Sequence, residues 1–173
     1  PTPAELTPRV DTLWTRNVQA LGLADFQACA LGGTPARLVV AIVPERLSIN
    51  GRQLMVLNPL TGDSLLTKQS GHTSDVTDMH FAARANIFAT ADYGTIKLWR
   101  WPELEVLREF RTPSDHQNRF LLTADGRRLF SNIDGVMYDT ETGDTIWQVE
   151  RAQVESFGTD VRPAMTADDS LLL

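Results

Sequence analysis

Four side chains of this sequence are the natural candidates for acid–base, nucleophilic or metal chemistry. They are the histidines His72, His80 and His116 and the single cysteine, Cys29. A zinc site typically requires ligands at short fixed spacings, such as C-x-x-C or H-E-x-x-H. None of the four has a partner at such a spacing. The sequence therefore predicts no metal site.

Catalytic and cofactor-binding motifs are also missing from the sequence. It contains no G-x-S-x-G nucleophile elbow, no G-x-x-x-x-G-K-[ST] phosphate loop and no G-x-G-x-x-G dinucleotide motif. Acidic pairs such as Asp168-Asp169 lie in predicted turns, where carboxylates are usually solvated. We therefore expect a protein that is not an enzyme, with no catalytic residues and no cofactor.

The most informative stretch is Gly71–Trp99, which begins with Gly-His and ends with Thr-Ile-Lys-Leu-Trp. Two short apolar runs follow the Gly-His pair, and the turn at residues 91–94 then leads into the closing run. This order of features resembles one WD-repeat, the roughly 40–45-residue unit that forms a four-stranded blade of a β-propeller. The resemblance implies an all-β fold and a place for each polar residue of the stretch.

In the WD-repeat family a histidine, a hydroxyl residue, an aspartate and a tryptophan form a hydrogen-bonded relay across the blade. The resemblance assigns these roles to His72, Thr90, Asp92 and Trp99. Buried imidazole, hydroxyl and indole groups need such partners, because an unpaired buried polar group is destabilising. The sequence differs from the family pattern in two ways: Tyr93 stands directly before the turn glycine, and Arg100 replaces the aspartate of the closing Trp-Asp.

An internal repeat of about forty residues extends the resemblance along the chain. Three third-strand ends align at Leu57, Trp99 and Tyr138, with separations of 42 and 39 residues. A short turn and a β-prone run follow each of them. The sequence predicts strands in these blades over residues 26–31, 37–43, 53–58, 63–67, 118–122, 127–133, 136–139 and 144–150.

The repeat divides the chain into blades of four antiparallel strands. Residues 1–20 are an extension with the outer strand of a preceding or closing blade, and residues 69–110 are the best-matching WD-repeat. The other divisions are blades at 21–68 and 111–150 and a partial blade at 151–173. A segment of a longer propeller, completed by the rest of its parent chain, is the favoured interpretation; a small closed four-blade ring is the alternative.

Composition limits the partners. The chain of 173 residues has a formal net charge of −6, and residues 71–173 hold 17 acidic against 10 basic side chains. This balance argues against a nucleic-acid footprint, which requires a basic patch. No apolar run reaches the ~20 residues of a membrane-spanning helix. A single cysteine excludes an internal disulfide framework and favours a reducing, cytoplasmic compartment.

We expect a non-catalytic scaffold that binds a protein or peptide partner on one face of the propeller. Loops on a rigid scaffold commonly carry such recognition. The loops that enter each blade and those between second and third strands form the expected face. Its candidate partner-binding residues are Arg46, Asp75, Tyr93 and His116.

Two other functions stay open. Residues 139–147 fit D-x-x-T-G-x-x-x-W, which is similar to the repeat of quinoprotein-like propeller enzymes. A regulatory propeller domain of a larger ATPase or kinase is the other alternative. The aromatic residues on strands, Trp147 among them, are predicted to be core. Trp101 lies just beyond a strand and is either an exposed binding anchor or packed over the outer strand.

Overall fold

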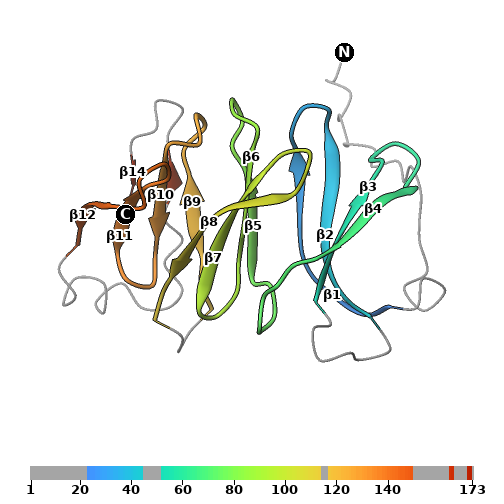
Figure 1. The fold of residues 1–173 in the computed structure, drawn as a ribbon, viewed down its shortest axis with the longest axis horizontal. Coiled ribbons are helices and arrows are strands. Elements are labelled where there is room, and N and C mark those ends of the chain that lie inside the picture. The colour runs from blue at the N-terminus through green and yellow to red at the C-terminus, as the bar shows by residue number, and fades with distance from the viewer. Residues whose placement is uncertain (1–22, 45–51, 114–116, 150–163, 166–170, 173) are drawn as a thin grey trace, which may run out of the picture.

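The computed structural model describes residues 23–44, 52–113, 117–149, 164–165 and 171–172. All regular structure in these residues is β-strand, with no helix, so the all-β expectation is confirmed. The strands form three antiparallel four-stranded sheets and one two-stranded pair (Figure 1).

In each four-stranded sheet the strands follow one another in chain order. The first sheet contains β1 (Leu23–Gly32), β2 (Arg37–Pro44), β3 (Gln53–Leu57) and β4 (Ser64–Gln69). The middle sheet contains β5 (Asp78–Phe81), β6 (Ile87–Ala91), β7 (Thr95–Arg100) and β8 (Glu105–Arg111). The third contains β9 (Phe120–Leu122), β10 (Arg128–Ser131), β11 (Val136–Asp139) and β12 (Thr145–Gln148). The pair is β13 (Ala164–Met165) with β14 (Leu171–Leu172).

The three sheets lie side by side, with the middle sheet between the other two (Figure 1). Their first strands are neighbours in space: β5 contacts both β1 and β9. Hydrogen bonds join the start of β5 to the start of β9: Asp78 accepts the Phe120 N–H at 3.3 Å, and Thr77, just before β5, donates to the Asn118 carbonyl at 2.7 Å. The first strand of the middle sheet thus lies beside the first strand of each neighbouring sheet.

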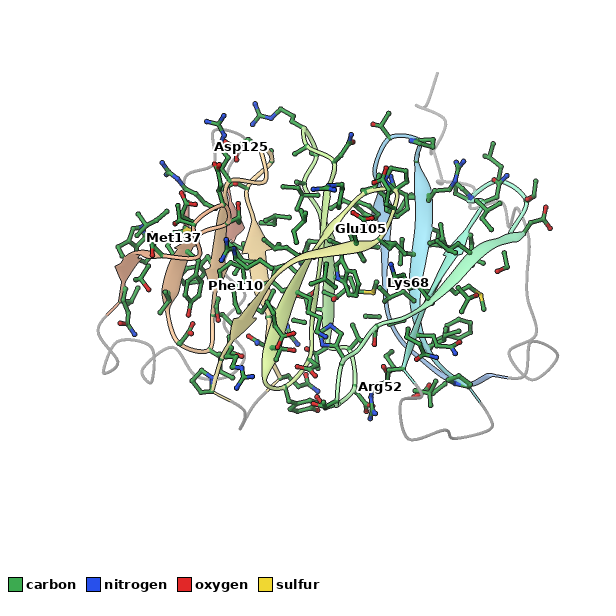
Figure 2. All side chains as sticks on the ribbon, in the orientation of Figure 1. Arg52, Lys68, Glu105, Phe110, Asp125 and Met137 are labelled. Atoms are coloured by element: carbon green, nitrogen blue, oxygen red, sulfur yellow. The ribbon has the colours of Figure 1, made fainter. Side chains whose placement is uncertain are left out.

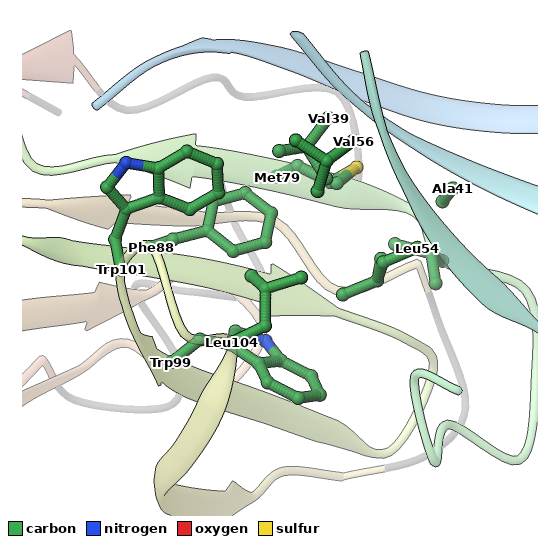
Figure 3. Close-up of a cluster of buried hydrophobic side chains, with 10 residues drawn as sticks. Val39, Ala41, Leu54, Val56, Met79, Phe88, Trp99, Trp101 and Leu104 are labelled. Atoms are coloured by element: carbon green, nitrogen blue, oxygen red, sulfur yellow. The ribbon is translucent and has the colours of Figure 1, made fainter. Parts of the chain in front are cut away.

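The two central strands of the middle sheet, β6 and β7, are buried on both faces, so apolar residues stand next to each other in them, as at 88–89 and 98–99. Phe88 and Trp99 face the first sheet, where they pack with Val39 and Leu54 in one cluster (Figure 3). Their chain neighbours Ala89 and Leu98 face the third sheet. Successive side chains of a strand point to opposite faces, so one pair of strands supplies both cores.

The outward face of the first sheet has a core of its own. Val40, Ile42, Met55 and Leu57 form a separate buried cluster there. Beside it lies a hollow of ≈ 490 Å³, whose lining includes Phe26, Cys29, Leu38, Val40, Met55 and Leu57. The first sheet therefore has apolar side chains on both faces, as the middle sheet does.

The fourth strand of each sheet carries a register shift at the same place. The shifts lie opposite Val56/Leu57, Leu98/Trp99 and Met137/Tyr138. They leave one residue of each outer strand outside the pairing: Leu65, Leu107 and Ile146. These side chains are large, apolar and exposed. An extra residue of this kind is a β-bulge, which bends the strand and increases its twist.

The burial of two tryptophans, Trp101 and Trp147, can be compared with the sequence-based predictions. Trp101 is buried against Phe81, with ring centroids 4.9 Å apart, so it packs in the core and is not an exposed anchor. The sequence predicts Trp147 to be core, but its exposed fraction is 38%, so this prediction is wrong. The reason is that β12 is an edge strand: among the described residues it pairs with β11 on one side and with no strand on the other.

Candidate functional site

A buried hydrogen-bonded network joins the loop before β5 to strands β6 and β7 of the middle sheet. Thr90 on β6 is its centre: its hydroxyl oxygen accepts the Trp99 indole N–H at 2.9 Å and lies 2.7 Å from Nε2 of His72. The other ring nitrogen, Nδ1, lies 3.3 Å from Asp92 and 3.2 Å from the Thr95 hydroxyl. The structure thus brings together all four residues to which the resemblance assigned the relay. A proton on Nδ1 suits this arrangement, because Nδ1–H then donates to the carboxylate and the Thr90 hydroxyl donates to Nε2.

Asp92 accepts most of the hydrogen bonds around the turn between β6 and β7. One carboxylate oxygen accepts three hydrogen bonds from the turn, with distances of 2.7–3.0 Å: the N–H groups of Gly94 and Thr95 and the Thr95 hydroxyl. The other accepts the N–H groups of Thr73 and Ser74 from the loop before β5. The carboxylate therefore joins the loop that enters the sheet to the turn at the end of its second strand.

The pKa of Asp92 reflects this arrangement. Burial of the carboxyl raises its pKa, but the hydrogen bond from His72 and the N–H of Gly94 lower it, as do the electrostatics of the ring and the Thr95 hydroxyl. The lowering effects outweigh burial, so the pKa of Asp92 is held well below its ordinary value of 3.8. The ionised form is favoured in the folded protein.

This network holds structure together; it offers no reactive group to a ligand. His72, Thr90, Asp92 and Trp99 are all buried, and each of their polar groups has a protein partner. Thr95, whose hydroxyl bridges His72 and Asp92, was not among the predicted members. Its place directly after the turn glycine is the signal that marks it.

The candidate partner-binding residue Asp75 lies at the surface beside this network, where an ion pair and a hydrogen bond hold its side chain. Its carboxylate pairs with Arg52 at 2.8 Å and accepts the side-chain amide of Gln27 at 2.6 Å. The Gln27 carbonyl oxygen in turn accepts the Val76 N–H at 3.0 Å. Asp75 is exposed, yet it links the first sheet to the middle sheet. Figure 2 marks Arg52 at the lower end of the molecule.

Tyr93 lies at the same end, on the turn between β6 and β7. Its N–H donates to the Ser74 hydroxyl at 3.1 Å, and its own hydroxyl accepts the side-chain amide of Gln117 at 3.4 Å. The ring is partly exposed, and Gln117 is exposed beside it. We call the surface formed by residues 70–77, 92–94 and 117–119 the lower face. The other two candidates, Arg46 and His116, lie outside the described residues.

The third sheet carries different polar groups at the corresponding place. Tyr138 pairs with Leu129 across β10 and β11 as Trp99 pairs with Phe88 across β6 and β7. Its hydroxyl donates to Asp134 at 2.8 Å. Burial, this hydrogen bond and the negative charge of Asp134 raise the pKa of Tyr138 above its ordinary value of 10.0.

His80 also has a partner. Its Nε2 lies 3.2 Å from Asp78, and its ring packs edge-on against Phe120 with centroids 5.1 Å apart. In the part of the chain that the structure describes, no group of three or more His, Cys, Asp or Glu residues is arranged to hold a metal ion.

Comparison with known proteins adds no assignment: no family model matches the chain, and no curated protein matches it. Among the described residues no helix has the length and apolarity that crossing a membrane requires.

Proposed function

We propose that this chain is a segment of a WD-repeat β-propeller that acts as a non-catalytic scaffold and binds a protein or peptide on its lower face. The observation that carries the proposal is the buried network of His72, Thr90, Asp92 and Trp99. The network holds the loop before β5 and the turn after β6 in fixed positions. Rigid loops on a β-scaffold are a common basis for recognition, because little conformational entropy is lost on binding.

The packing of the sheets supports the propeller part of the proposal. The middle sheet docks on the first through Phe88 and Trp99. In the first sheet, Leu38 and Leu57 occupy the same paired positions and line the outward hollow. In this proposal a further four-stranded sheet of the same propeller packs there. The contact would repeat the two interfaces already formed by the middle sheet.

Tyr93 is the residue that tests the binding surface most directly. In Tyr93→Ala the partner is expected to be lost from quantitative affinity purification with mass spectrometry, because a partly exposed aromatic ring is a typical binding anchor. The melting temperature is expected to stay close to that of the wild type. Asp75 is a poorer test, since its removal also breaks the contacts with Arg52 and Gln27.

Leu65→Ala provides a matched control, because Leu65 is an exposed apolar residue on β4, away from the lower face. It should retain every partner that the wild type retains. Equal recovery of partners with Tyr93→Ala and wild type would contradict the proposed binding surface. Loss of partners with both variants would also contradict it.

A further inference from the structure

Three buried polar atoms of the third sheet have no hydrogen-bond partner among the described residues. They are the side-chain carbonyl oxygen of Asn118, the hydroxyl oxygen of Ser131 and one carboxylate oxygen, Oδ1, of Asp134. Asn118 and Ser131 are completely buried. A buried polar atom that lacks a partner destabilises the fold, so the three atoms together point to a ligand with matching donors and acceptors.

The side chains of Asn118 and Ser131 point toward the middle sheet. The Asn118 amide N–H donates to the hydroxyl of Thr112, which follows β8. Ser131 is paired with Phe120 and lies two residues after Leu129, and both of these apolar residues pack against the middle sheet. Paired residues and alternate residues of a strand share a face, so the Ser131 hydroxyl lies on that side too.

Asp134 closes this polar region from the turn between β10 and β11. Its other carboxylate oxygen, Oδ2, accepts the Tyr138 hydroxyl at 2.8 Å. The Tyr138 ring packs against Phe110 of β8, with ring centroids 4.9 Å apart. Phe110 lies two residues before Thr112, and β8 ends beside the third sheet (Figure 1). The three unpartnered atoms therefore lie along one circuit of contacts between the two sheets.

In the middle sheet a histidine ring serves the corresponding hydroxyl. Ser131 corresponds to Thr90, since each lies two residues after the residue that pairs with the aromatic side chain of the third strand. The Thr90 hydroxyl has two partners, the Trp99 indole and the His72 ring. In the third sheet Tyr138 takes the place of Trp99 and donates to a carboxylate instead. The Ser131 hydroxyl is thus left without either kind of partner among the described residues.

We propose that Asn118, Ser131 and Asp134 hold an internal water molecule between the middle and third sheets. The two O–H groups of a water molecule match the acceptor oxygens of Asn118 and Asp134, and its oxygen accepts the Ser131 hydroxyl. Internal water molecules typically make about three such hydrogen bonds. A calcium ion is a poorer match, because it takes about six to eight oxygen ligands and this site offers one carboxylate. The site does not depend on the proposed function at the lower face.

A high-resolution crystal structure of the 173-residue chain is the direct test. A solvent peak is expected at about 2.7–3.0 Å from all three oxygen atoms. A cation bound at about 2.3–2.6 Å would overturn the proposal. Direct hydrogen bonds from a protein group to these atoms, or three atoms that share no solvent peak, would overturn it as well.

The melting temperature of Ser131→Ala tests the site in solution, because the sign of the change separates the two possibilities. If the hydroxyl binds water, its removal should lower the melting temperature by about 2–4 °C. Removal of a buried hydroxyl without any partner should instead leave the melting temperature unchanged or raise it, and that result would overturn the proposal. Ser64→Ala is the matched control, since Ser64 is an exposed serine on β4; its melting temperature should stay within about 1 °C of the wild type.

Discussion

At the scale of single residues, Asp92 stabilises the middle sheet through its charge. Five donors from two separate segments converge on the carboxylate, in addition to the ring of His72. Hydrogen bonds to a charged acceptor contribute more than neutral ones, about 1.5–3 kcal/mol each. Loss of this charge therefore affects both the loop before β5 and the turn after β6.

The lowered pKa of Asp92 predicts how stability depends on pH. Above the ordinary value of 3.8 the carboxyl is ionised in both folded and unfolded chains, so its full contribution is present. As the pH falls below 3.8, the unfolded chain takes up a proton that the folded chain does not, and stability falls by about 1.4 kcal/mol per pH unit from this group. The loss is complete only once the pH has passed the lowered, folded-state pKa. Asp92→Asn should remove this slope.

Urea unfolding at a series of pH values measures the effect. At neutral pH the Asp92→Asn variant should be less stable than the wild type by about 2 kcal/mol or more. The difference should narrow as the pH falls below 3.8. Asp144→Asn, at an exposed turn position, is the matched control. A gap between Asp92→Asn and the wild type that stays constant down to low pH would show that the charge of Asp92 is not what stabilises the fold.

The sequence was sufficient to suggest which residues meet in this network, because the family pattern gives each a type and a spacing. It was not sufficient for Asp75. The partner Gln27 lies 48 residues earlier, and only the packing of β1 beside β5 brings the two together. Long-range contacts between polar surface residues leave no periodic trace in a sequence.

At the scale of elements, the β1–β2 hairpin fits against the β7–β8 turn. Gly33 has a φ of 80°, and a Cβ placed on it would overlap Nε1 of Trp101. Glycine is required there for two reasons: the backbone conformation and the closeness of the indole. The hairpin of the first sheet is thereby positioned by a tryptophan of the middle sheet.

Gly33→Ala is therefore expected to destabilise the protein in two ways. The left-handed backbone conformation costs about 1–2 kcal/mol for a residue with a Cβ, and displacement of Trp101 adds to this. Gly135→Ala is the control, because Gly135 has a φ of 65° but lies in the β10–β11 hairpin. Chemical denaturation should give a larger loss for Gly33→Ala than for Gly135→Ala. Equal losses would mean that the contact with Trp101 contributes nothing.

Most strands could be predicted from short apolar runs bounded by turn residues. The predicted runs at 37–43 and 53–58 are observed as β2 (Arg37–Pro44) and β3 (Gln53–Leu57). Burial was harder to predict, as Trp147 illustrates. An alternating pattern identifies which residues share a face of a strand, but the packing of other sheets decides whether that face is covered.

At the scale of the whole molecule, the first sheet has an apolar outward face and a hollow beside it. Cys29, the single cysteine of the chain, is exposed and lines this hollow. Its thiol therefore reports whether anything lies against the face. The arrangement of sheets that creates the hollow could not be read from the strand pattern alone, because each strand run is equally compatible with a sheet covered on one side or on both.

In the 173-residue chain by itself, without a further sheet on the hollow, Cys29 is expected to react readily with Ellman's reagent under native conditions. Its rate should be within about tenfold of the rate in denaturant, since exposure limits the reaction of a free thiol. Cys29→Ser is the blank that accounts for background. A thiol that reacts only after unfolding would show that the face is covered, and would contradict the exposed position of Cys29.

The bulges at Leu65, Leu107 and Ile146 have a consequence for self-association. Each of the three sheets ends in an outer strand with apolar side chains exposed, and a flat strand of this kind would act as a template for ordered stacking of identical chains into fibrils. The extra residue interrupts the straight row of N–H and C=O groups that such growth requires. The molecule can therefore expose apolar side chains on its outer strands and still resist polymerisation through backbone hydrogen bonds.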